Sequence, residues 1–257
     1  IIDNLGLIGS LSVEHVRQSI LPIVLGFLLS VPLGWLAFRF RLGRGFILTF
    51  TGLLYTIPSL ALFVLLPGIL GISMLSELNM VVALALYAIA IMVRSVAEGL
   101  QSVEPSVRDA ATAVGFSSFR RFWTVEFPLA GPVILAGLRV TAVSTISLAT
   151  VGVLLGVTNL GYLFTNGFQR RIIPEILAGV VTVMLIALLV DLLLMLAGRA
   201  LMPWHRRVAK TRGASPSRGA AKRSANGRSA GDRSAEDRSA ADRSAENRSA
   251  AATRSAS

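Results

Sequence analysis

The sequence predicts an all-α polytopic membrane protein with about five transmembrane helices and a polar two-helix loop on its cytoplasmic side. Three observations support this fold class. Of the 257 residues, 53% are hydrophobic and only 15% are charged, with a mean hydropathy of +0.68; soluble domains usually carry about 25% charged residues. Five segments are apolar over the ~20 residues that a helix needs to cross the hydrocarbon core. One polar stretch of about thirty residues separates the third segment from the fourth.

The five predicted spans follow one another along the first two hundred residues. Pro22, Pro32 and Pro58 lie inside the first two spans, and membrane helices tolerate such prolines where neighbouring groups satisfy the freed carbonyls. The predicted bounds are Ser19–Phe38, Phe46–Leu66, Asn79–Val96, Gly131–Leu155 and Pro174–Gly198.

Arginine residues predict the orientation of these spans. With the N-terminus outside, the loops after the first and third spans face the cytoplasm and hold six arginines, as the positive-inside rule favours. The opposite orientation places all six outside. The sequence therefore predicts an outer N-terminus and an inner C-terminus. The six residues are Arg39, Arg41, Arg44, Arg108, Arg120 and Arg121.

The chain divides into a transmembrane domain, residues 1–204, and a basic tail, residues 205–257. Residues 1–205 carry 12 Arg against 9 Asp and Glu, whereas residues 206–257 carry 13 Arg and Lys against 5 acids. From residue 221 onward a five-residue unit ending in Arg-Ser-Ala recurs, and so polar a repeat is expected to be disordered. Beside an apolar body, the tail indicates a cytoplasmic end near a lipid membrane rather than a nucleic-acid partner.

The polar stretch at about residues 98–128 is expected to form two short helices. Val107–Val114 is rich in alanine and favours a helix, and Gly115 provides the left-handed conformation that ends one. Ser117 or Ser118 can cap a second helix. That helix would present Arg120, Arg121, Phe122 and Trp123. The sequence therefore predicts a docking element on the cytoplasmic face.

Within this loop Asp109-Ala110-Ala111, Gly115 and Pro128 have a recognisable spacing. It resembles the "EAA" loop of ABC importer permeases, written E-A-A-x3-G-x9-I-x-L-P, with Asp for Glu, Val125 for Ile and Phe127 for Leu. In that family the loop forms coupling helices that sit in a cleft of the ATPase subunit. The resemblance implies a coupling role for Asp109, Ala110, Ala111, Gly115 and Pro128. Arg120 and Arg121, on the second predicted helix of the loop, are expected to take part in the same coupling.

The same resemblance implies the fold of a type I ABC importer permease in a bacterial plasma membrane. The implied partners are ABC ATPase subunits, an extracytoplasmic substrate-binding protein, and a second permease copy or a sibling permease. The chain lacks the GxxxxGK[ST] phosphate loop, so ATP hydrolysis is expected in the partner and no enzyme activity here. No cofactor or metal site is expected, and the absence of Cys excludes thiolate ligands.

A narrower resemblance concerns the substrate. Residues 52–62 read GLLYTIPSLAL, similar to the GLLQTIPSLAL typical of osmoprotectant permeases, from which Tyr55 departs. Residues 133–140 (VILAGLRV) and the Leu160-Gly161 pair also look like this subfamily. The implied substrates are glycine betaine, choline, carnitine or proline. An importer of methionine or another amino acid is the alternative, and an ion channel or membrane scaffold is a more remote one.

A translocation path for such a substrate needs weakly polar walls and aromatic faces for a quaternary ammonium. Three candidates lie on the second span, and three on the fourth share one helical face by the i, i+3, i+4 rule. Hydroxyl side chains also serve helix packing in membranes, an interpretation that stays open. The candidates are Tyr55, Thr56, Ser59, Thr141, Ser144 and Thr145.

Two charges inside predicted spans are expected to form an ion pair. Arg139 lies about 12 Å into the fourth span and Asp191 about 10 Å from the end of the fifth, at 1.5 Å per residue. These similar depths predict a structural ion pair between the two spans. Residues 156–169 are apolar and too short to cross a membrane. They are expected to form either a gate-like loop on the outer face or a simple connection.

Overall fold

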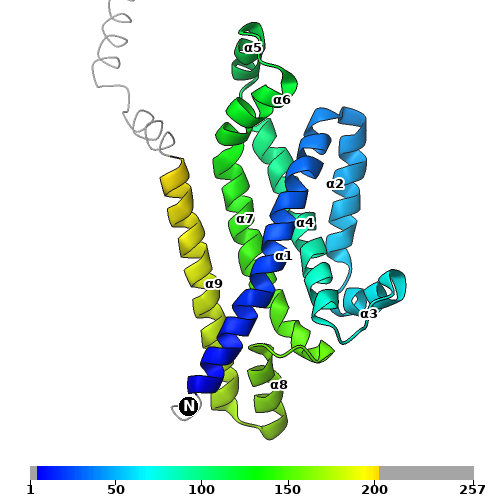
Figure 1. Ribbon diagram of the computed structural model, residues 1–257, viewed down its shortest axis with the longest axis vertical. Coiled ribbons are helices and arrows are strands. Elements are labelled where there is room, and N and C mark those ends of the chain that lie inside the picture. The colour runs from blue at the N-terminus through cyan, green and yellow to red at the C-terminus, as the bar shows by residue number, and fades with distance from the viewer. Residues whose placement is uncertain (1–4, 203–257) are drawn as a thin grey trace, which may run out of the picture. The chain divides into compact units, whose positions relative to one another are not determined.

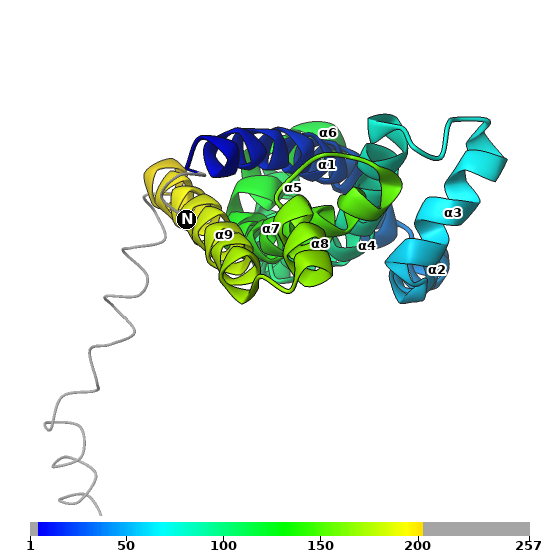
Figure 2. The same cartoon turned by 90° about the horizontal axis from the view of Figure 1, so that it is seen from below.

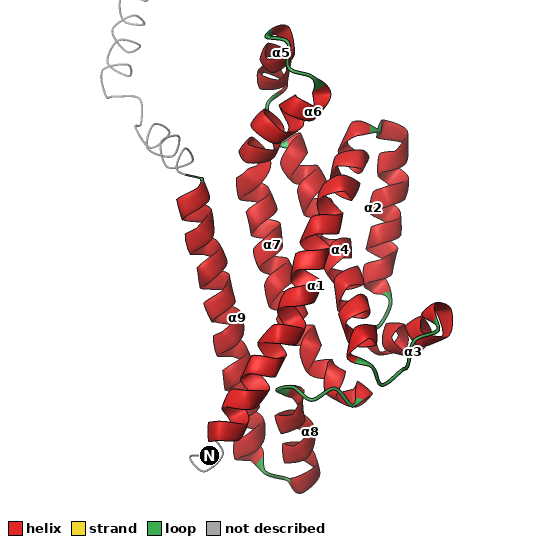
Figure 3. Ribbon diagram, viewed as in Figure 1, coloured by secondary structure: helices red, strands yellow, loops and turns green. Residues whose placement is uncertain are grey.

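The computed structural model describes residues 5–202, and helices are the only regular secondary structure in that range (Figure 3). The basic tail predicted for residues 205–257 lies outside it. In chain order the elements are α1 (Leu5–Arg39), α2 (Arg41–Thr56), α3 (Ser59–Leu70), α4 (Glu77–Gln101), α5 (Pro105–Ala113), α6 (Ser118–Arg121), the π-helical segment η2 (Phe122–Glu126), α7 (Phe127–Ala149), the 3-10 segment η3 (Thr150–Leu155), α8 (Gly161–Arg170) and α9 (Ile173–Leu201).

Helices α2, α4, α7 and α9 lie side by side, and α1 crosses one face of this layer (Figures 1 and 2). Helices α5 and α6 lie at one end of α7 and α8 lies near the other (Figure 1). In residues 5–202, four helices are long and apolar enough to span a membrane: α1, α4, α9 and the continuous helix Ser118–Leu155. The bent pair of α2 and α3 provides a fifth candidate. The predicted all-α fold with about five spans is confirmed.

The second predicted span, residues 46–66, is not one straight helix. The chain bends by 108° between α2 and α3. Pro58 provides no N–H and forces the preceding Ile57 into an extended conformation (φ −65°, ψ 126°). The Tyr87 hydroxyl on α4 donates a hydrogen bond to the carbonyl of Ile57, which satisfies an acceptor that the break leaves unpaired.

The most extensive helix contact is between α1 and α4, and small residues make it close. A Cβ on Gly26 would overlap the Cβ of Ala88, and a Cβ on Gly34 would lie 2.6 Å from the Cβ of Val96. Gly26, Ser30 and Gly34 recur every four residues on α1, and all three are buried. Such a stripe lets two backbones approach closely in a membrane protein. By contrast, α9 buries only Gly179, Ala187 and Gly198.

The η3–α8 loop, residues 150–161, is pinned to α1 by buried amide side chains. Asn159 Nδ2 donates to the Ala149 carbonyl at 2.8 Å and to Gln18 Oε1 at 3.2 Å. Asn159 Oδ1 accepts from the Gly161 N–H at 2.8 Å, and Gln18 Nε2 donates to the Thr158 carbonyl at 3.1 Å. Asn159 is fully buried and Gln18 is 3% exposed. This part of the stretch 156–169 is therefore a tightly held connection in the conformation described.

Candidate functional site

The α5–α6 loop, residues 102–126, folds as its local sequence predicts. Pro105 occupies the first turn of α5, where its missing N–H costs nothing. After α5, Gly115 has φ +90°, a conformation that residues with a Cβ rarely adopt. The Phe116 N–H returns to the Ala111 carbonyl at 3.1 Å, which closes the helix end. Ser117 then caps α6 by accepting a hydrogen bond from the Arg120 N–H.

A buried carboxylate holds the two halves of this loop together. Glu126, at the end of η2, is 2% exposed and accepts a hydrogen bond from Arg121 Nε at 2.8 Å. Arg108 of α5 lies 4.0 Å from the same oxygen. Arg121 Nη1 also donates to Thr112 Oγ1 at 2.8 Å. Because Glu126 immediately precedes α7, these contacts attach α5 and α6 to the start of that helix.

Arg108 adds a second attachment, to the helices that precede the loop. Its Nη2 donates to the carbonyls of Leu100 at 2.5 Å and Val103 at 2.8 Å. Its guanidinium lies 4.7 Å from the ring centre of Phe38, at the end of α1, a cation–π distance. Sequence analysis missed Arg108 and Glu126 as anchors. The sequence does contain a signal for this contact: Glu126 lies inside an apolar stretch close to several arginines. A buried acid needs a partner of opposite charge, so an ion pair with one of these arginines could have been predicted.

The loop exposes apolar and cationic groups, and Phe119 and Trp123 among them border a cavity next to α1. Val114 is 78% exposed, Phe119 74% and Trp123 47%. Arg120 is exposed and stacks 4.6 Å from the ring centre of Phe116. Of the predicted coupling residues on α5, Asp109 and Ala110 are exposed and Ala111 is half-buried. Pro128 lies in the first turn of α7. Exposed apolar groups with a rim of charge are typical of a protein-docking surface.

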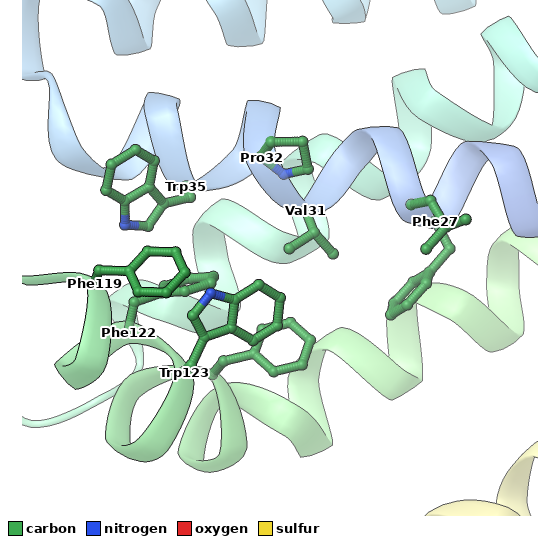
Figure 4. Close-up of a pocket in the computed structure, with 9 residues that line it drawn as sticks. Phe27, Val31, Pro32, Trp35, Phe119, Phe122 and Trp123 are labelled. Atoms are coloured by element: carbon green, nitrogen blue, oxygen red, sulfur yellow. The ribbon is translucent and has the colours of Figure 1, made fainter.

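An aromatic cavity of about 530 Å³ lies between this loop and α1 (Figure 4). Trp35 of α1 meets Phe122 edge-to-face with ring centres 6.0 Å apart, and Phe122 meets Trp123 at 5.0 Å. The lining is apolar and aromatic, so it packs η2 against α1 without fixed polar partners. The loop therefore contacts α1 as well as α7. The residues labelled in Figure 4 are Phe27, Val31, Pro32, Trp35, Phe119, Phe122 and Trp123.

Arg139 and Asp191 form a bidentate ion pair between α7 and α9. Arg139 Nε donates to Asp191 Oδ1 and Nη2 to Oδ2, both at 2.6 Å. The side chains are 36% and 24% exposed and line a cavity of about 510 Å³ together with Ser144 and Val140. The pair joins two spans, as their similar depths in the sequence predicted. It also places charge on the wall of a cavity, which the sequence did not indicate.

The six residues predicted for the translocation path are not brought together. Tyr55 is 51% exposed and lines a further cavity, between α2 and α4, whereas Ser144 lines the cavity of the Arg139–Asp191 pair. Thr141 and Thr145 are buried, and Thr141 donates back to the Gly137 carbonyl at 2.9 Å.

Two of the predicted path residues flank the α2–α3 break. Thr56 is exposed, and its hydroxyl donates to the Leu53 carbonyl at 2.7 Å. Ser59 begins α3. The break therefore separates the hydroxyls of the second span. On α7, Ser144 is half-buried beside the buried Thr141 and Thr145.

Comparison with known proteins identifies similar chains. The sequence profile of the family described as "Binding-protein-dependent transport system inner membrane component" matches residues 23–207. The osmoprotectant import permease protein OsmW of Salmonella typhimurium (strain LT2) is 33% identical over 195 residues, which cover 75% of this chain and 91% of that protein. The choline transport system permease protein OpuBB of Bacillus subtilis is 32% identical over 194 residues, covering 74% and 86%.

Among solved structures, an inward-facing conformation of the MetNI methionine ABC transporter matches with a TM-score of 0.68. The match covers 77% of this chain and 97% of that chain, at 18% sequence identity. At this identity the similarity concerns the fold, and it agrees with the helical arrangement described above.

Proposed function

Because the chain belongs to the family of binding-protein-dependent transport system inner membrane components, we propose that it imports a small osmoprotectant as the permease subunit of an ABC importer. Its fold is that of an importer permease, and its helices suit a multi-pass membrane protein. The observation that carries the proposal is the α5–α6 loop, in which a capped two-helix element exposes apolar and cationic side chains and is anchored to α7 through Glu126.

In this proposal the α5–α6 loop docks into a partner ATPase on the cytoplasmic side, with the N-terminus outside and the C-terminus inside. Asp109, Ala110, Ala111, Arg120 and Arg121 face or flank the docking surface. ATP binding draws two ATPase subunits together, and the loop passes this movement to α7 and α1. A second permease copy or a sibling completes the pathway, and an extracytoplasmic binding protein delivers the substrate.

The substrate class rests on the relatives. OsmW is named for osmoprotectant import and OpuBB for choline transport, and this chain matches both over most of their length. We therefore assign glycine betaine, choline, carnitine or a similar compound to this chain. Tyr55 and Ser144 are the path residues best supported, because each lines a cavity. The other four predicted residues remain path candidates. Thr56 is exposed and Ser59 half-buried beside the α2–α3 break, whereas Thr141 and Thr145 are buried and would have to become exposed in another conformation.

The coupling role is tested with Gly115→Val. A branched side chain is strained at φ +90° by roughly 1–3 kcal/mol, so the end of α5 shifts and the docking surface is distorted. We expect uptake of glycine betaine to fall at least tenfold while the protein stays in the membrane. Gly115→Asn is the matched control, because Asn tolerates the left-handed conformation. Normal uptake by the Val variant would contradict the coupling role, and a channel would keep its conductance in both variants.

Partners and substrate are tested by gentle affinity purification from native membranes. We expect an ATPase with a phosphate loop and an extracytoplasmic binding protein to co-purify with the chain. Competition of uptake then separates the substrate classes: glycine betaine should compete and methionine should not. Competition by methionine alone would replace the osmoprotectant assignment with an amino-acid importer. Recovery of the chain alone, from membranes where other complexes survive, would contradict the importer.

A further inference from the structure

We propose that the cavity between α2 and α4 is a transit site for a small zwitterion that carries both a quaternary ammonium and a carboxylate. This inference rests on the proposed function and names the part of the chain that contacts the substrate during passage. It adds Arg94 and Glu98, which sequence analysis did not consider, to Tyr55. It also predicts which osmoprotectants the pathway favours.

The cavity lies between one face of each of two antiparallel helices. Thr51 and Tyr55, four residues apart, line it from α2, and Arg94, Ser95 and Glu98 line it from α4. Its volume is about 370 Å³, within the range of roughly 300–1,000 Å³ typical of small-molecule sites. Because the helices run in opposite directions, the end of α2 that carries Tyr55 points away from the α5–α6 loop, whereas the end of α4 that carries Glu98 leads into that loop (Figure 1).

The end of the cavity next to Tyr55 provides an aromatic ring in a fixed position. Tyr55 packs edge-to-face with Tyr87, with ring centres 6.0 Å apart and an interplanar angle of 82°. Tyr87 is 4% exposed and its hydroxyl is bonded to the Ile57 carbonyl, so Tyr55 has a rigid neighbour. Tyr55 itself remains 51% exposed. An aromatic ring held in this way suits a quaternary ammonium, which has no N–H to donate and is bound by aromatic faces.

The other end of the cavity provides both charges that a zwitterion needs. Arg94 Nε lies 3.0 Å from Glu98 Oε1, and the side chains are 69% and 54% exposed. This contact engages one of the five N–H donors of the guanidinium, so its remaining fork can bind a carboxylate in a bidentate manner. Glu98 attracts an ammonium. The pair is neutral overall and therefore favours a neutral zwitterion over a simple cation such as choline.

Arg94 lies two residues before the end of the third predicted span, residues 79–96, and seven residues before Gln101, the last residue of α4. Its guanidinium therefore reaches toward the water-facing end of the bundle while its aliphatic stem lies along the cavity wall. The cavity of the Arg139–Asp191 pair is adjacent, because Val140 lines both cavities. The two ion pairs thus lie in neighbouring cavities, the first on α4 and the second between α7 and α9.

Saturation-transfer NMR on the N-methyl protons of glycine betaine tests the site directly. The permease is assembled with its ATPase in nanodiscs, without the binding protein, and the signal of empty nanodiscs is subtracted. We expect a signal for glycine betaine and a weaker one for choline at equal concentration. Arg94→Gln should weaken glycine betaine binding about tenfold or more, because it removes a charge-assisted bidentate contact. It should not weaken choline binding, because Glu98 then keeps its negative charge without a neighbouring cation. Tyr55→Ala should weaken both.

Two further variants separate recognition from folding. Arg94→Lys keeps the charge and should keep the preference for glycine betaine over choline. Arg17→Gln removes another exposed ion pair, with Glu14 and Glu77, and should bind both compounds as the wild type does. No signal from the wild type, or equal signals from Arg94→Gln and Arg17→Gln, would overturn the inference.

Uptake by the same wild-type preparation, supplied with the binding protein, distinguishes this outcome from failure of the proposed function. If glycine betaine enters although no NMR signal is seen, only the transit site is wrong. If neither glycine betaine nor choline enters, the proposed function itself fails.

Discussion

The two loops that flank α7 are both held by a buried polar side chain, but the chemistry of the two anchors differs. In the α5–α6 loop, the carboxylate of Glu126 attracts two arginines, at 2.8 and 4.0 Å. In the η3–α8 loop, the neutral amide of Asn159 makes three separate hydrogen bonds between 2.8 and 3.2 Å. The loops also differ in surface: Val114 and Phe119 are largely exposed in the first, whereas Leu155 and Leu160 are buried in the second.

The difference indicates which end of α7 can move while staying attached. Coulomb attraction falls slowly with distance, so Glu126 can hold both arginines through a small displacement. Hydrogen bonds weaken steeply with distance and angle, so the Asn159 network holds only one geometry. A loop that a partner displaces needs an anchor such as the Glu126 carboxylate, which tolerates small changes in distance. A loop that keeps one end of the bundle fixed needs an anchor such as the Asn159 amide, which does not.

The largest effect is expected where a charge replaces the neutral anchor. Asn159→Asp turns a double donor into an anion that faces the Ala149 carbonyl and the Gln18 amide oxygen. We expect a loss of about 3 kcal/mol in the free energy of unfolding, the cost of burying a polar group without partners. Denaturant unfolding of the purified permease measures it. Thr158→Asp, at an exposed neighbour, should change stability by less than about 0.5 kcal/mol.

The reverse change, Glu126→Gln, should have a smaller effect on stability and a larger one on coupling. The amide keeps one acceptor for Arg121 but removes the charge that attracts Arg108. We expect a loss of about 2 kcal/mol, below the 3–5 kcal/mol of a fully buried pair, since both arginines are 21% exposed.

The ratio of substrate imported to ATP hydrolysed, measured in proteoliposomes with the partner subunits, should fall in Glu126→Gln. Glu104→Gln, an exposed acid in the same loop, should leave this ratio unchanged. Equal ratios in the two variants would show that the charge of Glu126 has no part in transmission.

The smallest effect is expected from the helix cap of the α5–α6 loop. Ser117→Ala removes the acceptor for the Arg120 N–H and should cost about 1 kcal/mol, read as a lower midpoint of thermal unfolding. Ser118→Ala, one residue into α6, should cost less than half as much. A larger effect at Ser118 would place the cap one residue later and would change the start of the docking helix.

The α5–α6 loop was largely predictable from the sequence, because its signals are local. Pro105, Gly115 and Ser117 each determine the backbone next to them, through a fixed φ, a left-handed turn and a capping hydroxyl. The spans were also predictable, since twenty apolar residues need no distant partner to be identified. The Arg139–Asp191 contact followed from depth alone, because both charges lie at similar heights in neighbouring helices.

Features that depend on distant residues were not predictable in the same way. The Asn159–Gln18 contact joins residues 141 positions apart, and nothing near either residue indicates the other. The 108° turn at Pro58 depends on Tyr87 as well as on the proline. The predicted face of Thr141, Ser144 and Thr145 is divided, because helical spacing identifies neighbours on a helix and not what that helix packs against.

The close contact between α1 and α4 has a consequence for the biogenesis of this protein. Gly34 and Val96 meet across that contact, yet the ribosome makes Val96 62 residues later. At about 5–20 residues per second, the delay is roughly 3–12 s. Until α4 is made, α1 lacks the partner that covers its stripe of small residues. A chain that ends before residue 96 would therefore leave this stripe without its partner helix.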